Sequence, residues 1–308
     1  MAALLPSGRQ VELSAYGQSA VVVEVGGGIR DYRVDGRPVL DGYSADEMCT
    51  AARGLPLVPW PNRLHDGAYS WDGRDYQLPL DENEKSNALH GLARWLSWAP
   101  VAVADDRATM AVTLWPRPQW PFTLSVSVEY VLGPSGLTVT TIAEATGQSD
   151  VPYASGQHPY LTVGTATVDE AELHLSAATY LPTDADQIPT GRAEVAGSPY
   201  DFRSARPIGD LQVDLAFTDL ARGPDGLARL TLRNPADGRE AELWVDGAYD
   251  FLEVFTGDSV PQPARRRRGL GVEPMTAPPD ALRTGEGVVR LAPGDLHTAR
   301  WGIVPLGW

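Results

Sequence analysis

Apolar and polar residues alternate with a period of two along most of the chain. The segments that show this pattern are residues 29–34, 109–115, 123–132, 137–143, 171–175, 227–233 and 241–245. Because successive side chains of a β-strand point to opposite faces, the alternation is typical of strands that bury one face. The sequence therefore predicts a long series of β-strands.

Turn signals separate the predicted strands at short intervals. Asp-Gly pairs between alternating segments favour hairpins, and they occur at residues 35–36, 41–42, 72–73 and 237–238. A triple glycine at residues 26–28 follows the β-branched run 21–25. The segment after it alternates like a strand, whereas a dinucleotide or phosphate loop requires a helix there. We therefore exclude such a loop.

The chain shows no convincing helical period, and residues 278–282 offer one helical turn at most. Many short strands joined by turns, without a repeat or a linker, indicate an all-β fold. We predict a large antiparallel β-sandwich in which residues 1–308 form a single domain. Large all-β folds commonly use a length of this order as one unit.

Charge and composition narrow the possible partners. The formal net charge is −15, and Lys85 is the only lysine. This balance argues against nucleic acid and against anionic membranes as general partners.

Sequence features also bear on the location of the protein. No apolar run approaches the ~20 residues that a membrane span requires. One cysteine, Cys49, excludes an intrachain disulfide and a cysteine-based zinc cluster, and it fits a reducing compartment. With no signal peptide recognisable at the N-terminus, we expect a cytoplasmic protein.

The first candidate for chemistry is His158, which precedes Pro159. Proline pushes the residue before it into an extended conformation, so the imidazole is held on a backbone with little freedom. Such restraint suits a side chain that must be aimed at a substrate, although a packed or capping histidine satisfies the same pattern. The residues that favour the functional interpretation are Asn62, Arg63, His90, Asp214 and Glu273.

At this point the sequence resembles the aldose 1-epimerases, also called galactose mutarotases. The matching pieces follow one another in order over some 200 residues. They are Asn62-Arg63, the hairpin at 69–78, His90-Gly91, His158-Pro159-Tyr160, the loop 180–191, Asp201-Phe202-Arg203, Ile208-Gly209, Asp214, Phe255-Thr256-Gly257, residues 271–276 and Pro279-Asp280-Ala281. No single piece is specific, but their order is.

The resemblance implies a β-supersandwich that interconverts the α and β anomers of a free hexopyranose without a metal or another cofactor. It implies that His158 acts as general acid on the ring oxygen and Glu273 as general base on the anomeric hydroxyl. The further candidates for substrate binding are Asn62, Arg63, His90, Gln157, Tyr160 and Asp214. The expected partner is a small sugar, and the expected state is a monomer or homodimer.

The residue types suit this chemistry without the resemblance. Opening a cyclic hemiacetal removes a proton from one oxygen and delivers a proton to another oxygen of the same carbon. A carboxylate and an imidazole can supply these two functions near neutral pH, provided that their environments differ. A nearby carboxylate such as Asp214 would favour the imidazolium form of His158.

Simpler interpretations remain for several residues. Glu273 could be an acid in a solvated loop, and His90 could belong to a turn. Asp214 could face solvent from a strand, and Arg63 could be a cation on the surface. Trp60 and Tyr160 could stack on a sugar, but aromatic residues of a β-sandwich more often belong to the core.

Two features depart from a simple free-sugar enzyme. Many relatives carry asparagine where this chain has Gln157, which puts one hydrogen bond to the sugar in question. The run from Arg265 to Arg268 is either a solvated loop or a local anion site for a phosphorylated or sulfonated hexose, since the arginine fork suits such groups. Further alternatives are a non-catalytic sugar-binding module and a glycoside hydrolase with paired carboxylates.

Overall fold

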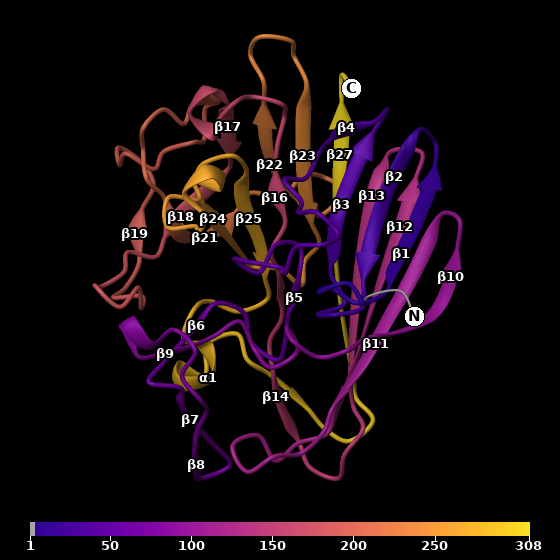
Figure 1. The fold of residues 1–308 in the computed structure, drawn as a ribbon. Coiled ribbons are helices and arrows are strands. Elements are labelled where there is room, and N and C mark those ends of the chain that lie inside the picture. Colours follow the sequence, from indigo (N-terminus) through magenta and orange to yellow (C-terminus); the bar gives the residue numbers. More distant parts are fainter. Residues whose placement is uncertain (1–3) are drawn as a thin grey trace.

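The computed structural model describes residues 4–308, and almost all of its regular structure is antiparallel β-sheet. Figure 1 shows two large groups of strands standing against each other, with β13, β23 and β27 in one group and β18, β21, β24 and β25 in the other. This arrangement confirms the predicted all-β fold with large antiparallel sheets.

The largest sheet has nine strands. In spatial order they are β10 (Ala99–Ala104), β11 (Arg107–Leu114), β12 (Leu124–Gly133), β13 (Gly136–Ala145), β27 (Leu296–Leu306), β23 (Glu240–Val245), β22 (Ala228–Arg233), β17 (Glu172–Leu175) and β20 (Arg206–Pro207). The predicted alternation holds here: Leu124, Val126 and Val128 of β12 are buried, while Ser125 and Ser127 are only half-buried. One face of this sheet therefore faces the core.

A second sheet has eight strands and carries most of the site described below. Its order is β19 (Ala193–Glu194), β18 (Ala177–Tyr180), β21 (Asp214–Leu220), β24 (Phe251–Phe255), β25 (Leu270–Met275), β15 (Gly156–Gln157) and β5 (Pro56–Leu57), with β16 (Tyr160–Leu161) also paired to β25. Every residue of β24 and β25 is buried. These two strands are therefore covered on both faces, which explains why their sequences do not alternate simply.

Smaller elements complete the described chain. The strands are β1 (Gln10–Ala15), β2 (Gln18–Val23), β3 (Ile29–Val34) and β4 (Arg37–Pro38) in one sheet, and the pairs β6 (Arg63–His65) with β9 (Asn87–Leu89), β7 (Ala68–Trp71) with β8 (Arg74–Gln77), and β14 (Val151–Tyr153) with β26 (Val289–Leu291). The helical elements are the 3-10 turns Asn83–Lys85, Val168–Glu170 and Pro263–Arg265 and the single α-helical turn α1 (Ala281–Thr284). The absence of a recognisable helical period agrees with these short elements.

One hydrophobic core joins the sheets. Its buried members come from β1 near one end of the chain and from β27 near the other, and also from the strands between them. Val11, Tyr130, Leu252 and Trp301 illustrate this range, since each is at most 4% exposed. On the strength of this shared core we propose that the chain folds as one domain. No helix among residues 4–308 is long and apolar enough to cross a membrane.

Candidate active site

A cavity of about 410 Å³ opens on one face of the eight-stranded sheet. Segments that are distant in sequence line it: the loop 48–52, the β6 and β9 pair with its flanking residues, the β15–β16 connection, and single positions of β21, β24 and β25. Seven of the eight predicted site residues line this cavity, namely Asn62, Arg63, His90, His158, Tyr160, Asp214 and Glu273. We refer to it as the cleft.

His158 and Glu273 lie in contact at the floor of the cleft. The distance between His158 Nε2 and Glu273 Oε1 is 3.1 Å, and the two side chains are 5% and 3% exposed. His158 sits between β15 and β16, where its backbone N–H donates to the carbonyl of Leu55 and its carbonyl accepts from the N–H of Gly54. Glu273 lies in the middle of β25, directly opposite Glu253 of β24. Both groups are thus fixed by backbone pairing and not by flexible loops.

Burial shifts the pKa values of this pair in opposite directions. The pKa of His158 falls to about 3, because burial and the nearby Arg53 both disfavour the imidazolium. The pKa of Glu273 is raised, because burial and the neighbouring carboxylate of Asp214 disfavour its charge more than Arg63 favours it. The electrostatics of the cleft therefore favour a neutral imidazole beside a protonated carboxyl group.

His90 and Asn62 both have strained backbone conformations, and hydrogen bonds join them to each other. Both have left-handed conformations, with φ values of 59° and 54°, which non-glycine residues adopt infrequently and mostly for a structural or functional reason. The backbone N–H of Asn62 donates to His90 Nδ1 at 3.2 Å, and the N–H of His90 donates to the carbonyl of Asn62. Gly91 follows with φ at +74°, and a Cβ there would lie 2.1 Å from the carbonyl oxygen of Val58. Only glycine fits this position.

The hydrogen bond from the Asn62 N–H also determines which ring nitrogen of His90 carries the proton, and therefore whether His90 could bind a metal ion. His90, His158 and Glu273 offer three potential ligand atoms within 4.8 Å of one another, a spacing compatible with a metal ion. Because His90 Nδ1 accepts a hydrogen bond, the neutral imidazole carries its proton on Nε2. A protonated nitrogen donates to an oxygen and does not bind a metal. Burial and the adjacent His158 keep the pKa of His90 well below its usual value, so this neutral form is the relevant one.

Arg63 and Asp214 form the polar side of the cleft. Arg63 makes a two-pronged contact with Glu82, at 2.9 and 3.1 Å, and its Nη2 lies 3.8 Å from Asp214 Oδ2. Gln187, from the loop 180–191, donates to the same oxygen of Asp214. Burial lowers the pKa of Arg63, but the surrounding carboxylates of Asp214 and Glu82 more than offset this effect. Arg63 therefore remains a fixed cation beside the cleft.

Tyr160 supports His158 from behind. The two rings stack with centroids 4.9 Å apart and planes 11° apart, and the Tyr160 hydroxyl donates to the carbonyl of Ala51. The guanidinium of Arg53 lies 4.1 Å from the centre of the Tyr160 ring and pairs with the buried carboxylate of Asp41 at 3.3 Å. Trp60 instead belongs to the main core, as the common role of such aromatics suggests.

Gln157 is the one predicted site residue that the structure keeps away from the cleft. Its side chain is 1% exposed and donates to the hydroxyl of Thr141 on β13 of the nine-stranded sheet. Adjacent residues of an extended segment point to opposite sides, so the backbone that directs His158 into the cleft directs Gln157 into the interior. Gln157 therefore does not line the cleft, and its side chain already has a partner within the protein.

The arginine run also lies outside the cleft. Among the described residues, none of Arg265 to Arg268 lines that cavity. Arg267 pairs with Asp169 and Asp258, and Arg266 donates to the carbonyl of Val260. The run is thus not placed to hold a charged group of a sugar bound at His158 and Glu273.

Three further charged residues at the site were not predicted from the sequence: Glu253 and Arg53, which are buried, and Arg94, which is half-buried. Glu253 is 2% exposed and lies directly opposite Glu273 in the strand register, and burial together with the charge of Asp214 raises its pKa. The signal for Glu253 was a lone acid in an otherwise apolar strand. Arg53 and the cleft-lining Arg94 come from irregular segments and carry no comparable signal.

Comparison with known proteins gives a consistent family assignment. Residues 9–303 match the sequence profile of the aldose 1-epimerases. The Escherichia coli protein YihR, described as uncharacterized, is 31% identical over 96% of this chain and 93% of its own length. Human galactose mutarotase is 29% identical over 48% of this chain, a match that spans 44% of the human protein.

Solved structures agree with the fold. A putative aldose 1-epimerase from Escherichia coli superposes with a TM-score of 0.83 at 22% identity, over 97% of this chain and 99% of that one. An aldose epimerase homologue from Caenorhabditis elegans gives a TM-score of 0.86 at 18% identity, over 97% and 99% of the two chains. The profile match over residues 9–303 shows that the chain belongs to the aldose 1-epimerase family.

Proposed function

We propose that this protein is a mutarotase that interconverts the α and β anomers of a free hexopyranose by opening and reclosing the ring. The observation that carries the proposal is the 3.1 Å contact between His158 Nε2 and Glu273 Oε1, buried at the floor of a cleft of about 410 Å³. That volume lies in the range of pockets that hold small ligands. The galactose mutarotases among its relatives support a hexose as substrate.

The proposed reaction needs one acid and one base. Glu273, as carboxylate, takes the proton of the anomeric hydroxyl, while His158, as imidazolium, gives its proton to the ring oxygen. The bond between the anomeric carbon and the ring oxygen breaks, and the carbonyl of the open-chain aldose forms. Rotation about the adjacent carbon–carbon bond presents the other face of the carbonyl. The reverse proton transfers then close the ring and restore both side chains.

The pKa shifts suit the open-chain stage of this cycle. After ring opening His158 is neutral and Glu273 is protonated, which is the distribution that burial favours in the cleft. The shifts therefore stabilise the high-energy intermediate relative to the ion pair that begins the reaction. Because His158 and Glu273 are in direct contact, one proton shared between them produces either distribution.

The surrounding residues have binding roles in this proposal. His90 presents an Nε2–H as donor, Arg63 a fixed guanidinium and Asp214 an acceptor, and together they would orient the sugar hydroxyls and the ring oxygen. Asn62 fixes the tautomer of His90, and Tyr160 fixes the ring plane of His158. Positioned acid and base groups each contribute a factor of about 10²–10⁴ to such reactions.

Polarimetry tests the proposal. Fresh α-glucose and α-galactose should mutarotate faster with the protein, and both Glu273→Gln and His158→Asn should remove the acceleration. Glu286→Gln is the matched control, because Glu286 is an exposed glutamate outside the cleft and its replacement should change nothing. If the wild-type protein accelerates neither sugar, the proposed activity on these free hexoses is wrong, and acceleration of a hexose 6-phosphate alone would favour a phosphorylated substrate. Sugar binding measured by calorimetry without acceleration would instead favour a binding module.

A further inference from the structure

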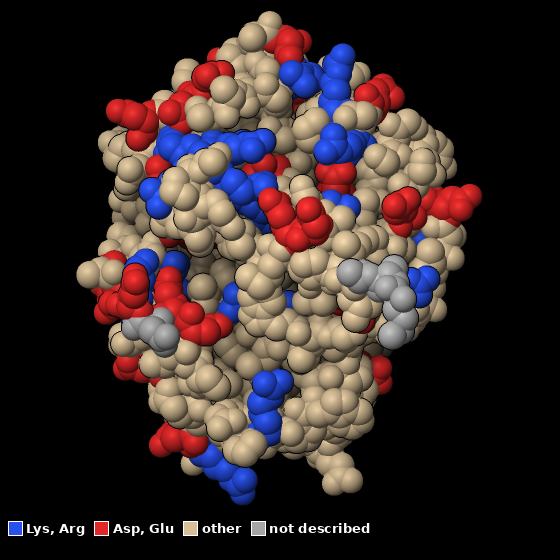
Figure 2. Space-filling view, in the orientation of Figure 1, with Lys and Arg blue, Asp and Glu red and all other residues tan. Residues whose placement is uncertain are grey.

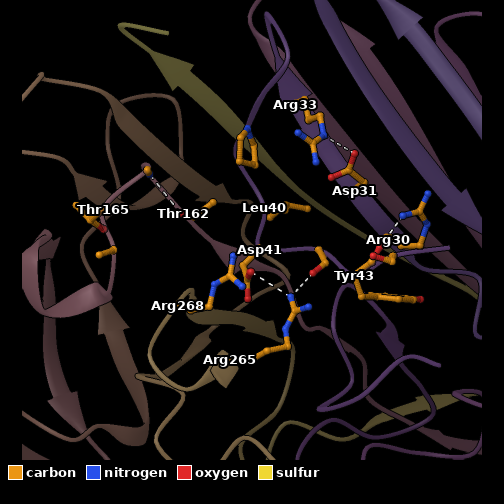
Figure 3. A pocket seen from close by; sticks show the side chains of 15 residues that line it. Arg30, Asp31, Arg33, Leu40, Asp41, Tyr43, Thr162, Thr165, Arg265 and Arg268 are labelled. Carbon is orange, nitrogen blue, oxygen red and sulfur yellow. Dashed lines mark hydrogen bonds and ion pairs between the residues drawn. The ribbon is translucent and has the colours of Figure 1, made fainter. Parts of the chain in front are cut away.

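A second cavity, of about 560 Å³, lies apart from the cleft and shares none of its lining residues. Figure 2 shows arginine side chains gathered in the upper half of one face of this otherwise acidic molecule. Figure 3 shows the cavity itself, with arginines from two distant parts of the chain around it. They are Arg30, Arg33, Arg265 and Arg268. We refer to it as the arginine cavity.

Backbone contacts bring the walls of the arginine cavity together. Arg30 and Arg33 lie on β3, while Arg265 and Arg268 lie in the turn before β25. Leu40 forms a bridge with Leu161, and the N–H of Asp41 donates to the carbonyl of Tyr160. The cavity therefore lies between β3 and irregular segments that backbone contacts tie to β16 of the eight-stranded sheet.

The arginines are only partly neutralised. Arg33 pairs with Asp31 at 2.8 Å, and Arg265 pairs with Asp41 at 3.1 Å and with Glu47 at 3.8 Å. Asp41 is shared, because it also pairs with Arg53 on the cleft side. Within the part of the chain that the structure describes, Arg30 and Arg268 make no ion pair with a carboxylate. The cavity therefore has an excess of positive charge in a protein whose net charge is −15.

Hydrogen-bond donors also remain available. Arg30 uses Nε and Nη1 on Gln10 and the carbonyl of Tyr43, which leaves Nη2. Arg265 uses Nη2 on Asp41 and the carbonyl of Gly42, while its buried Nε has no partner in the described structure. The guanidinium of Arg268 makes no hydrogen bond to residues 4–308. Among these donors only Arg265 Nε is buried, whereas Arg30 and Arg268 are half-buried and exposed, so their remaining N–H groups can be reached by an acceptor from outside the protein.

From this geometry we propose that the arginine cavity binds a small oxyanion, either free phosphate or sulfate or the phosphate group of a small metabolite. Several planar guanidinium groups around one cavity can donate together to the tetrahedrally arranged oxygens of such an anion, each of which accepts more than one hydrogen bond. The excess positive charge favours a dianion over a monoanion. The proposal concerns a site separate from the mutarotase cleft and does not depend on the reaction proposed there.

The arginine run supplies its own matched control. Arg266 and Arg268 are both exposed and stand two residues apart, but only Arg268 lines the arginine cavity. Replacing either with alanine removes one exposed charge and leaves the ion pairs of Asp41 intact. Arg267 is unsuitable for comparison, because it pairs with Asp169 and Asp258 and replacing it would unsettle the fold.

Isothermal titration calorimetry at low ionic strength tests the proposal with three probes: inorganic phosphate, sulfate and glucose 6-phosphate. Wild type should bind at least one of them, and Arg268→Ala should weaken that binding about tenfold, as expected for loss of a charge-assisted hydrogen bond. Arg266→Ala should bind like wild type. Tighter binding of glucose 6-phosphate than of phosphate would identify a phosphorylated metabolite, and the opposite order would identify the free ion.

Two results would overturn the proposal: no binding of any probe by wild type, or equal weakening by Arg266→Ala and Arg268→Ala. The second result would mean that the anions respond only to net charge. Mutarotation by Arg268→Ala should equal that of wild type, so failure of the anion site and failure of the mutarotase proposal remain distinguishable.

Discussion

The two faces of the paired strands β24 and β25 carry different kinds of residue, although both faces are buried. One face presents Leu252, Val254 and Val272 to the main hydrophobic core. The other face presents Glu253 and Glu273, which lie directly opposite each other in the strand register. The second face also carries Phe251, Phe255 and Met275, so one pair of strands places an apolar face back to back with a face on which two carboxyl groups lie among apolar residues. We refer to the second as the charged face.

We infer that the core face of β24 and β25 mainly stabilises the fold, whereas the face with Glu253 and Glu273 mainly serves the chemistry of the cleft. Apolar burial on the core face stabilises the fold. Buried carboxylates on the other face destabilise it, because each must lose its hydration or keep a proton. Such groups are retained where their shifted pKa values are useful, and proteins commonly give up stability at sites of this kind. The two faces should accordingly respond to substitution in opposite ways.

The largest expected effect on stability comes from Leu252→Ala on the core face. Leu252 is 0% exposed, and removing a fully buried leucine side chain costs about 2–5 kcal/mol of unfolding free energy. Glu273→Gln should leave the unfolding free energy equal or higher, because it removes a buried ionisable group from a cluster of carboxylates. Urea unfolding measures both variants.

Activity should show the reverse order. Leu252→Ala, assayed below its unfolding range, should keep most of the mutarotation rate per folded molecule, whereas Glu273→Gln should lose it. If Leu252→Ala and Glu273→Gln lower stability equally, the proposed separation of the two faces is wrong.

Sequence alone predicted the strands that have one face toward solvent better than the roles of individual residues in β24 and β25. The alternating segments of β11, β12, β13, β22 and β23 all became strands, and the hairpin around Asp72 and Gly73 formed as expected. Alternation arises when one face meets solvent. In β24 and β25 both faces are buried, so the role of Glu253 depends on the pairing with β25, which a single sequence does not reveal.

The arginine run illustrates a second limit. Its four side chains diverge because Arg267 adopts a left-handed backbone, with φ at 58°. That turn directs Arg267 to Asp169 and Asp258 and leaves Arg268 at the arginine cavity. Four identical residues in a row do not show which side chain will point in which direction, because the surrounding packing determines those directions. The sequence therefore left a solvated loop and an anion site as alternatives for the run, and it did not reveal that Arg268 lines a cavity separate from the cleft.

A smaller effect is expected from Gly91→Ala, which tests whether the charged face also depends on strained backbone. A Cβ at residue 91 would lie 2.1 Å from the carbonyl oxygen of Val58, and φ is +74°. Such strain costs about 1–3 kcal/mol, which should appear as a lower melting temperature. Because His90 would move with its neighbour, mutarotation per folded molecule should fall as well. Gly73→Ala is the control, since a Cβ there meets nothing within 4 Å at a similar φ of +72°.

If Gly91→Ala and Gly73→Ala have the same consequences for activity, the close approach of Gly91 to Val58 does not position His90. A fall in stability without a fall in activity would lead to the same conclusion.

The smallest expected effect concerns Glu253, which lies on the charged face but does not line the cleft. Burial and the charge of Asp214 raise its pKa above the ordinary value of 4.5. Between 4.5 and this raised value the folded protein holds a proton that the unfolded chain has released, so the contribution of Glu253 to stability falls as pH rises. Glu253→Gln removes this titration. The unfolding free energy of the variant minus that of wild type should therefore increase from about pH 5 to about pH 8.

Urea unfolding of wild type and Glu253→Gln at both pH values measures this difference, with Glu286→Gln as an exposed control that should show no such increase. The mutarotation rate of Glu253→Gln should change less than tenfold, because glutamine can still donate a hydrogen bond to Asp214 and does not replace His158 or Glu273. A difference in unfolding free energy that stays constant with pH would mean that Glu253 ionises normally in the folded protein. The contrast between the two faces would then rest on Glu273 alone.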